Sequence, residues 1–240
     1  MTVSNDKVWH TPIKAYSDFL GMKDEHGLEN VLKLGKFQKV RETRALAVLC
    51  FAMYKSMGTP WYLQLDQSEV TDGRIMRLSP TEQGGLELLR VEHTAYVRRK
   101  DGKPPDKTLL DQLKASKTFE SHHKYDEHTL IMVDLGNGFD ETTGVDFNAI
   151  ADYLRSIDAP YQLWALEQVE HDNPDTIVQV TLCTPEVGQL RLNVGEAWHE
   201  QFEKNIRGTL VATQTADAEK AGKITPNDNP VTRAVWDFEG

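Results

Sequence analysis

Asp72, Glu92 and Thr94 are the residues of this chain whose types and spacing best suit a chemical site. Carboxylates on two neighbouring strands supply the oxygen ligands that Mg²⁺ and Mn²⁺ prefer, while water and a substrate phosphate fill the remaining positions. Because side chains alternate along a strand, Glu92 and Thr94 share one face with Arg90, and His93 points to the other face. A carboxylate inside a strand is costly unless a cation or a donor satisfies it. We therefore predict Asp72 and Glu92 as the metal ligands.

Glu42 is a third carboxylate that could reach the same site. It lies in a run rich in Ala, Leu, Met, Lys and Arg, which favours a long helix. Leu46, Leu49 and Met53 form a stripe that places Glu42 on or beside an inward-facing side of this helix. There it could orient a ligand or a water molecule. The neighbouring basic residues either contact substrate phosphate or are solvated helix charges: Lys39, Arg41 and Arg44.

Other acids, histidines and glycines are weaker candidates. Glu69 ranks second to Asp72 as a metal ligand, and Asp66 follows, because the turn before residue 73 could bring either one forward. Gly136-Asn137-Gly138 lacks the third glycine of a phosphate-binding loop and precedes acids, so a tight turn is favoured there. The densest His/Asp cluster falls in a polar loop, which favours solvated side chains over a Zn²⁺ or Mn²⁺ site: His122, His123, Asp126 and His128.

An alternation of helices and strands must position these residues. We predict a helix over 36–57 ended by Gly58, then strands over 61–65, 73–78 and 86–98. Next we predict a helix over 107–119, a strand over 129–135, a helix over 146–157, and strands over 161–169, 177–183 and 189–194. The expected fold class is α/β, with a mixed central sheet flanked by helices and additional C-terminal strands. The expected domains are an N-terminal helical extension (1–35), an α/β domain (36–200) and a loosely held C-terminal tail (201–240).

The order and spacing of these elements resemble the PD-(D/E)XK nuclease superfamily, which has the restriction-endonuclease-like fold. In that superfamily a helix bearing a Glu precedes a mixed sheet, an Asp starts one strand, and a D/E-x-K triplet lies on the next. The matching residues here are Glu42, Asp72 and the triplet Glu92-His93-Thr94, in a resemblance that covers about residues 36–170. It implies a metal-dependent endo- or exonuclease that holds Mg²⁺ or Mn²⁺ with Asp72 and Glu92 and acts on DNA or RNA.

Thr94 departs from the superfamily pattern, because it stands where the catalytic Lys belongs. A Thr hydroxyl offers one neutral donor in place of the cation that would stabilise the pentavalent phosphate or position the attacking water. A Lys from a neighbouring element could take that role. The candidates are Lys117 and Lys124 after the triplet and, less plausibly, Arg90. The implied catalytic set is thus Glu42, Asp72, Glu92 and Thr94, with a cation such as Lys117.

Charge is unevenly placed along the chain. The net charge of −10 argues against a protein whose whole surface grips nucleic acid. However, residues 31–60 carry six basic residues and one acid, and residues 95–117 carry seven basic residues and three acids. Residues 131–200 carry thirteen acids and two bases. The basic segments flank the predicted site in the sequence, where substrate phosphates would lie.

Cysteine usage and hydropathy bear on the cellular setting. Cys50 and Cys183 have apolar neighbours, so we expect buried free thiols, as in a reducing cytoplasm. No apolar run approaches the roughly 20 residues that a membrane span needs, and residues 1–14 do not resemble a secretory signal. We expect a cytoplasmic protein without membrane association.

Two other functions remain open. A catalytically inactive nuclease-fold protein could act as a binding or interaction subunit, with a protein partner or as a homodimer. Thr94 and the net charge of −10 favour this alternative. In an unrelated α/β binding protein, Glu92 would merely pair with Arg90 or Lys117, and the sheet face would lack a cleft beside it.

Overall fold

The computed structural model describes residues 6–65, 73–78, 86–95, 107–116, 125–137, 145–168, 177–184, 186–203, 209–213 and 233–235. The chain divides into two compact units. Unit 1 comprises residues 1–89 and 196–240, and unit 2 comprises residues 90–195. The chain therefore leaves unit 1 once and returns to it.

The helices of unit 1 start and stop where local chemistry dictates. The Thr11 hydroxyl accepts a hydrogen bond from the backbone N–H of Lys14 at 3.2 Å and so caps the first helix. Gly58 ends the longest helix with a φ of 70°, a left-handed conformation that glycine adopts without strain. These helices are α1 (Pro12–His26), α2 (Leu28–Lys33) and α3 (Gln38–Met57), with a 3₁₀ turn at Gly35–Phe37 and with α7 (Val194–Glu203) starting at the unit boundary.

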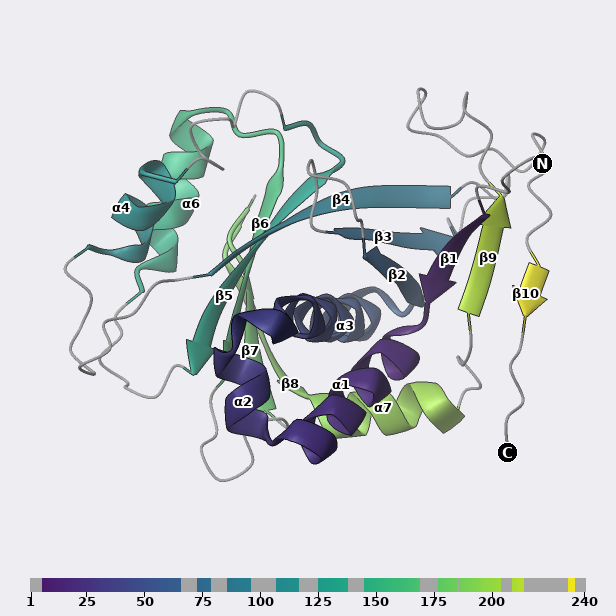
Figure 1. Ribbon diagram of the computed structural model, residues 1–240. Helices are drawn as coiled ribbons and strands as arrows, with labels where there is room; N and C mark the ends of the chain where they lie inside the picture. The colour runs from purple at the N-terminus through teal and green to yellow at the C-terminus, as the bar shows by residue number, and fades with distance from the viewer. Residues whose placement is uncertain are drawn as a thin grey trace, which may run out of the picture. The chain divides into compact units, whose positions relative to one another are not determined.

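The strands of unit 1 are antiparallel and lie in the order β10-β9-β1-β2-β3 (Figure 1). β1 runs between β9 and β2, and all five of its residues pair with β9, from Asp6 opposite Thr213 to His10 opposite Thr209. The bounds are β1 (Asp6–His10), β2 (Trp61–Leu65), β3 (Gly73–Leu78), β9 (Thr209–Thr213) and β10 (Arg233–Val235).

Helix α3 packs closely on its neighbours in unit 1. The Phe51 ring meets the Tyr16 ring of α1 edge-on, with centroids 6.1 Å apart and planes at 79°. On the sheet side, a Cβ added to Gly73 of β3 would lie only 2.6 Å from Cδ1 of Leu46. A strand glycine of this kind marks a close approach between elements. Helix α3 is therefore wedged between α1 and the sheet of unit 1.

Unit 2 has a mixed sheet. β4 (Leu86–Ala95) crosses the unit boundary, and its part in unit 2 pairs parallel to β5 (Thr129–Asn137), which pairs parallel to β6 (Gln162–Gln168). β7 (Ile177–Leu182) and β8 (Gly188–Asn193) follow as antiparallel neighbours. Parallel neighbours need crossover connections, and α4 (Leu109–Lys114) and α6 (Phe147–Ser156) lie in them. β5 continues through Gly136 and Asn137, where the sequence predicts a turn.

The core of unit 2 lies between this sheet and helices α4 and α6. The Asp146 side chain accepts a hydrogen bond from the Ala149 backbone N–H at 2.9 Å and so fixes the start of α6. Members of this cluster alternate along β5 and β6, and the residues between them, such as Leu130, Met132 and Trp164, are buried as well, as in strands with both faces covered. The cluster comprises Leu109, Leu113, Ile131, Val133, Leu135, Ile150, Leu154, Tyr161, Leu163, Ala165 and Cys183.

The fold agrees with the expected class, because helices pack on a mixed sheet. The chain order helix, strand, strand, strand, helix, strand is present in α3, β2, β3, β4, α4 and β5. β2 and β3 have the predicted bounds, and α4 is shorter than predicted. Whether this is a restriction-endonuclease-like core stays a prediction. None of the helices in the described residues is long and apolar enough to cross a membrane.

The division into units differs from the expected domains. The segment 1–35 contributes strand β1, and the segment 201–240, expected to be a loosely held tail, contributes β9 and β10 to the same sheet. The reason is physical. The hydrogen bonds of β1 are made with a strand about 200 residues away, so they leave no local pattern in the sequence.

Candidate functional site

Glu92 and Thr94 lie in the part of β4 that pairs with β5. The register places Glu92 opposite Ile131 and Thr94 opposite Val133, two members of the core between the sheet and helices α4 and α6. Residues opposite one another in a ladder point to the same face. Both side chains therefore project toward the helix-covered face, where they are half-buried, and His93 projects toward the other face. The register agrees with the alternation expected from the sequence.

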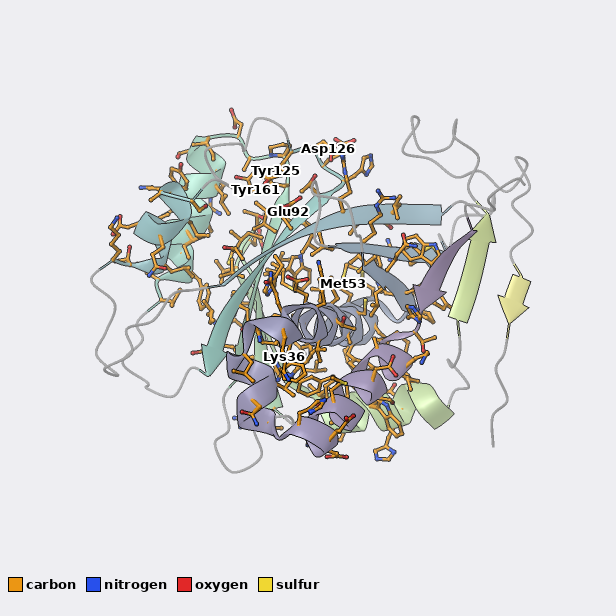
Figure 2. All side chains as sticks on the ribbon, viewed as in Figure 1. Lys36, Met53, Glu92, Tyr125, Asp126 and Tyr161 are labelled. Carbon is orange, nitrogen blue, oxygen red and sulfur yellow. The ribbon has the colours of Figure 1, made fainter. Side chains whose placement is uncertain are left out.

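Arg90 is held by Asp126, which precedes β5. The two side chains form a hydrogen-bonded ion pair, and the Arg90 backbone N–H donates to the His128 carbonyl oxygen at 2.8 Å. The second Asp126 oxygen accepts hydrogen bonds from the Thr129 hydroxyl at 3.0 Å and from the His128 backbone N–H at 3.1 Å. Asp126 thereby ties the turn before β5 to β4; Figure 2 labels it with Glu92 in unit 2. Both charges of this pair thus have structural partners.

The His/Asp cluster that the sequence favours as solvated lies partly within the described residues. Across the described ranges, no group of three or more His, Cys, Asp or Glu side chains is placed to hold a metal ion. His128 lies 3.7 Å from the exposed Glu127 carboxylate, as expected for a solvated turn. His122 and His123 lie outside the described residues.

Glu42 is buried in α3, with 2% of its surface exposed. Gln38 Nε2 donates a hydrogen bond to its Oε1 at 2.8 Å, and Lys39 Nζ lies 2.9 Å from its Oε2. Both partners belong to the same helix and precede Glu42 by one turn. The prediction of an inward-facing carboxylate is therefore confirmed, but both of its oxygens have partners within α3. Each oxygen keeps a second lone pair, and Oε2 accepts no hydrogen bond, so these contacts alone do not exclude a metal-directed role for Glu42.

Two of the basic residues that the sequence leaves open as phosphate contacts or solvated helix charges are engaged within unit 1. Arg41 Nη1 donates to the carbonyl oxygens of Val31 at 3.0 Å and Leu34 at 2.9 Å, which lie at the end of α2. The Arg44 guanidinium lies 5.3 Å from the centre of the Phe19 ring, within cation–π range. These side chains position α2 and α1 against α3.

The structure does not define where the remaining predicted site residues lie relative to Glu92 and Thr94. Glu42 belongs to unit 1 and Glu92 to unit 2, and no common point for them is defined. Several candidates lie outside the described residues: Asp72, Lys117, Asp66, Glu69 and Lys124. The metal site formed by Asp72 and Glu92 therefore stays a prediction.

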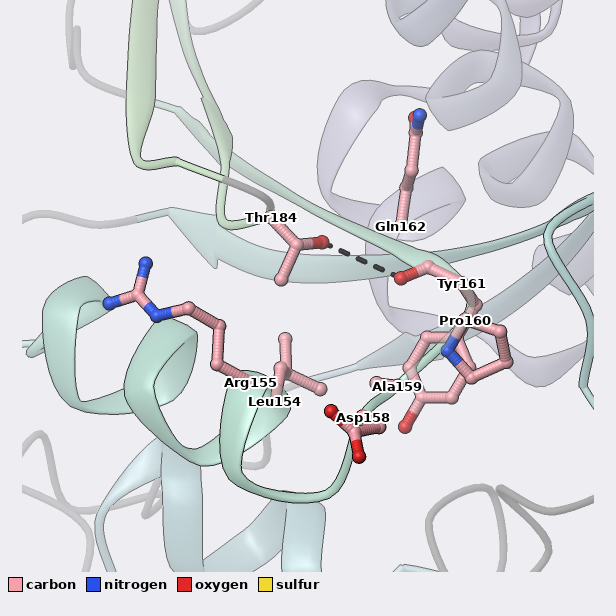
Figure 3. Close-up of a pocket in the computed structure, with 8 residues that line it drawn as sticks. All are labelled: Leu154, Arg155, Asp158, Ala159, Pro160, Tyr161, Gln162 and Thr184. Atoms are coloured by element: carbon pink, nitrogen blue, oxygen red, sulfur yellow. Dashed lines mark hydrogen bonds between the residues drawn. The ribbon is translucent and has the colours of Figure 1, made fainter.

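Unit 2 also contains a pocket that the sequence patterns did not single out. It has a volume of about 550 Å³ and lies where α6 ends, β6 begins and β7 ends (Figure 3). Its lining comprises residues 158–162 with Leu154, Arg155 and Thr184. In the sequence, Asp158-Ala159-Pro160 signals a loop after a helix, but a loop signal does not reveal that the surrounding side chains line an open pocket.

Tyr161 and Thr184 form the buried wall of this pocket. The Thr184 hydroxyl accepts a hydrogen bond from the Leu163 backbone N–H at 3.3 Å and donates to the Tyr161 carbonyl oxygen at 3.5 Å. Burial, together with neighbouring Tyr153 and Tyr125, raises the pKa of Tyr161 well above its usual range. The Tyr161 phenol is therefore neutral at physiological pH. The wall is therefore uncharged.

Comparisons of the chain with protein-family models, curated proteins and solved structures gave no match. A functional proposal therefore depends on the residues and their geometry. Glu92 and Thr94 are the two predicted catalytic residues that share an element and a face.

Proposed function

We propose that this chain is a nuclease-like protein that hydrolyses phosphodiester bonds in nucleic acid, with Mg²⁺ or Mn²⁺ held by Asp72 and Glu92. The observation that carries the proposal is the position of Glu92. It is a half-buried acid inside a strand, opposite core residue Ile131 and on the same face as Thr94, which is the placement that the superfamily's triplet requires. The chain order from α3 to β5 supports the same reading, because the resemblance to the nuclease superfamily requires it.

Each residue has a distinct role in this proposal. Asp72 and Glu92 would supply the oxygen ligands, and a metal held there would lower the pKa of a water molecule and stabilise charge on the phosphate. Thr94, on the same face as Glu92, donates one neutral hydrogen bond to a phosphate oxygen. Lys117 supplies the cation that the third position of the triplet lacks.

Metal titration tests the proposal directly. Isothermal titration calorimetry with Mn²⁺ should show one site that is lost in Asp72→Asn and Glu92→Gln, because each variant removes a charged ligand. Cleavage of single-stranded DNA, double-stranded DNA and RNA should disappear in the same variants. Glu127→Gln is the matched control, because this acid is 81% exposed and lies in the turn before β5. The proposal is wrong if both ligand variants bind Mn²⁺ with the affinity of the wild type and also match its cleavage of DNA and RNA.

A catalytically inactive nuclease-fold protein that acts as a binding or interaction subunit is the second candidate. The geometry of Glu42 favours it, because Gln38 of the same helix already donates to this carboxylate and Lys39 balances its charge. Lys55, another base of α3, is paired with Glu200. On this interpretation, Thr94 can stand at the third position of the triplet because a protein that does not cleave nucleic acid needs no catalytic Lys there. The protein would then bind a protein partner, or a second copy of itself, without cleaving nucleic acid.

Thr94→Lys separates the two candidates. If Asp72 and Glu92 hold a metal, the new ammonium group restores the triplet and should raise cleavage about 10²–10³-fold, the typical value of one donor directed at developing charge. Thr43→Lys on α3 adds the same charge on another element and should change nothing. An inactive subunit would show no cleavage in wild type or in Thr94→Lys. Light scattering would then report whether the chain is a homodimer.

A further inference from the structure

Met57 is the most exposed methionine in the described part of the chain. It is the last residue of α3, and 43% of its surface is exposed. Met53, which lies one turn earlier in the same helix and is labelled in Figure 2, is only 1% exposed. Met76 and Met132 are buried as well, and Met22 is half-buried. An oxidant in solution therefore reaches the sulfur of Met57 before the others.

The Met57 sulfur lies against a cation. Arg77 Nη1 of β3 donates a hydrogen bond to Met57 Sδ at 3.4 Å. Two other residues hold the same guanidinium. Arg77 Nε donates to Glu87 Oε2 at 2.6 Å, and the guanidinium lies 5.1 Å from the centre of the Trp61 ring, its cross-strand neighbour. The Arg77 side chain is 21% exposed. The donor that faces the sulfur is therefore fixed by contacts that do not involve Met57.

The backbone on the other side of this contact is also fixed. Gly58 ends α3 in the left-handed conformation, and its N–H donates to the Tyr54 carbonyl oxygen at 2.7 Å. The contact between Met57 and Arg77 thus joins the end of α3 to β3. A thioether sulfur is only a weak hydrogen-bond acceptor. A sulfoxide oxygen is a strong one, and a bond from a charged donor is roughly twice as strong as a neutral bond. Arg77 therefore suits the oxidised side chain better than the reduced one.

We propose that Met57 is a site of reversible oxidation by hydrogen peroxide and that Arg77 receives the sulfoxide oxygen. A sulfur lone pair attacks one peroxide oxygen, the S–O bond forms as the O–O bond breaks, and the other oxygen leaves as water with the proton of the transferred oxygen. Sulfur loses two electrons and the peroxide gains them. A thiol-dependent methionine sulfoxide reductase reverses the change, because two thiols become a disulfide and the oxygen leaves as water.

Peroxide treatment of the full chain, followed by peptide mass spectrometry, tests the site. Met57 should be converted at least about tenfold faster than Met53, since the two share a helix and differ in exposure. In urea the two rates should become equal. A methionine sulfoxide reductase added to the folded, oxidised chain should restore Met57. Equal rates in the folded chain overturn the proposal, and so does a sulfoxide that the reductase cannot reduce.

Urea unfolding tests the role of Arg77. Oxidation should raise the unfolding midpoint of the wild type, because a stronger bond joins α3 to β3, and it should not raise that of Arg77→Gln. Met57→Leu shows what oxidation elsewhere contributes and should not gain stability. Met22→Leu is the matched control and should respond like the wild type. An equal shift in the wild type and Arg77→Gln refutes the assignment of Arg77, as does a lower midpoint in the oxidised wild type.

A spectroscopic measurement on the wild type avoids any variant that fails to fold. The Arg77 Nε–H and Trp61 indole N–H resonances should shift on oxidation, because the guanidinium touches both the sulfur and the ring. The indole resonance of Trp9, which packs with Met76 in a separate cluster, should stay in place. Unchanged Arg77 and Trp61 resonances contradict the proposal. Glu92→Gln should be oxidised like the wild type, so failure of the proposed nuclease chemistry would leave these results unaffected.

Discussion

Replacing Lys39 by Met tests whether Glu42 is a structural carboxylate of α3. Glu42 is 2% exposed, and Lys39 Nζ is the cation 2.9 Å from its Oε2. Without Lys39, a buried charge keeps only its hydrogen bond from Gln38. Removing one partner of a fully buried ion pair costs about 3–5 kcal/mol, but Lys39 is 58% exposed and solvent already screens it. We expect a smaller loss, about 1–2 kcal/mol of unfolding free energy.

The double variant Lys39→Met/Glu42→Leu should recover most of that loss. It removes the charge together with its partner, and replacing such pairs by apolar residues of similar volume is often neutral or stabilising. Its unfolding free energy should lie within about 1 kcal/mol of wild type and above that of Lys39→Met alone. In a chain of this size, 1 kcal/mol corresponds to about 2–4 °C in Tm.

Urea unfolding followed by circular dichroism and by tryptophan fluorescence measures these differences. Lys14→Met is the matched control, because Lys14 pairs at 3.3 Å with an exposed acid, Asp18, and its loss should cost less than about 1 kcal/mol. The reasoning is refuted if Lys39→Met is no less stable than Lys14→Met while the double variant loses several kcal/mol. The charge of Glu42 would then be needed for a reason other than its pairing within α3.

Three further outcomes follow from packing and burial. Gly73→Ala should lose about 1–3 kcal/mol in urea unfolding, because the new methyl group would meet Leu46, whereas Gly21→Ala in a helix with open space should gain about 0.5–1 kcal/mol. Burial raises the pKa of Cys183 to about 12, which leaves about one thiolate in 10⁴ at pH 8, so a thiol reagent should label it only after unfolding. Burial, assisted by a nearby lysine, lowers the pKa of His10, so the native state binds this proton less readily than the unfolded chain. Stability should therefore fall as the pH drops below about 6.5, and His10→Gln should flatten that dependence in urea titrations at pH 5–8.

Elements with local signals could be predicted from the sequence. Helix α3 runs from Gln38 to Met57, close to the predicted 36–57, because strong helix formers fill it and Gly58 terminates it. β2 and β3 were also predictable from their β-branched, aromatic and apolar residues between turn signals. β1, β9 and β10 were not, because their stability comes from pairing between the two ends of the chain. Their own sequences carry little pattern.

Only those features of the candidate site that depend on strand or helix periodicity could be predicted from the sequence. The two-residue repeat of a strand placed Glu92 and Thr94 on one face, and the helical repeat turned Glu42 inward. The partners of Glu42 were visible as well, because Gln38 and Lys39 precede it by four and three positions, the spacing at which helical side chains meet. The pocket beside Asp158 had no such signal, since it depends on how α6 meets the sheet.

The pairing of β1 with β9 has a consequence for biosynthesis. β1 leaves the ribosome before the strand that covers one of its edges, which begins at Thr209, about 200 residues later. At typical translation rates of about 5–20 residues per second, that edge stays open for roughly 10–40 s. An uncovered strand edge can pair with another nascent chain. Slowed translation between these segments should therefore increase aggregation during synthesis more than it affects the finished protein.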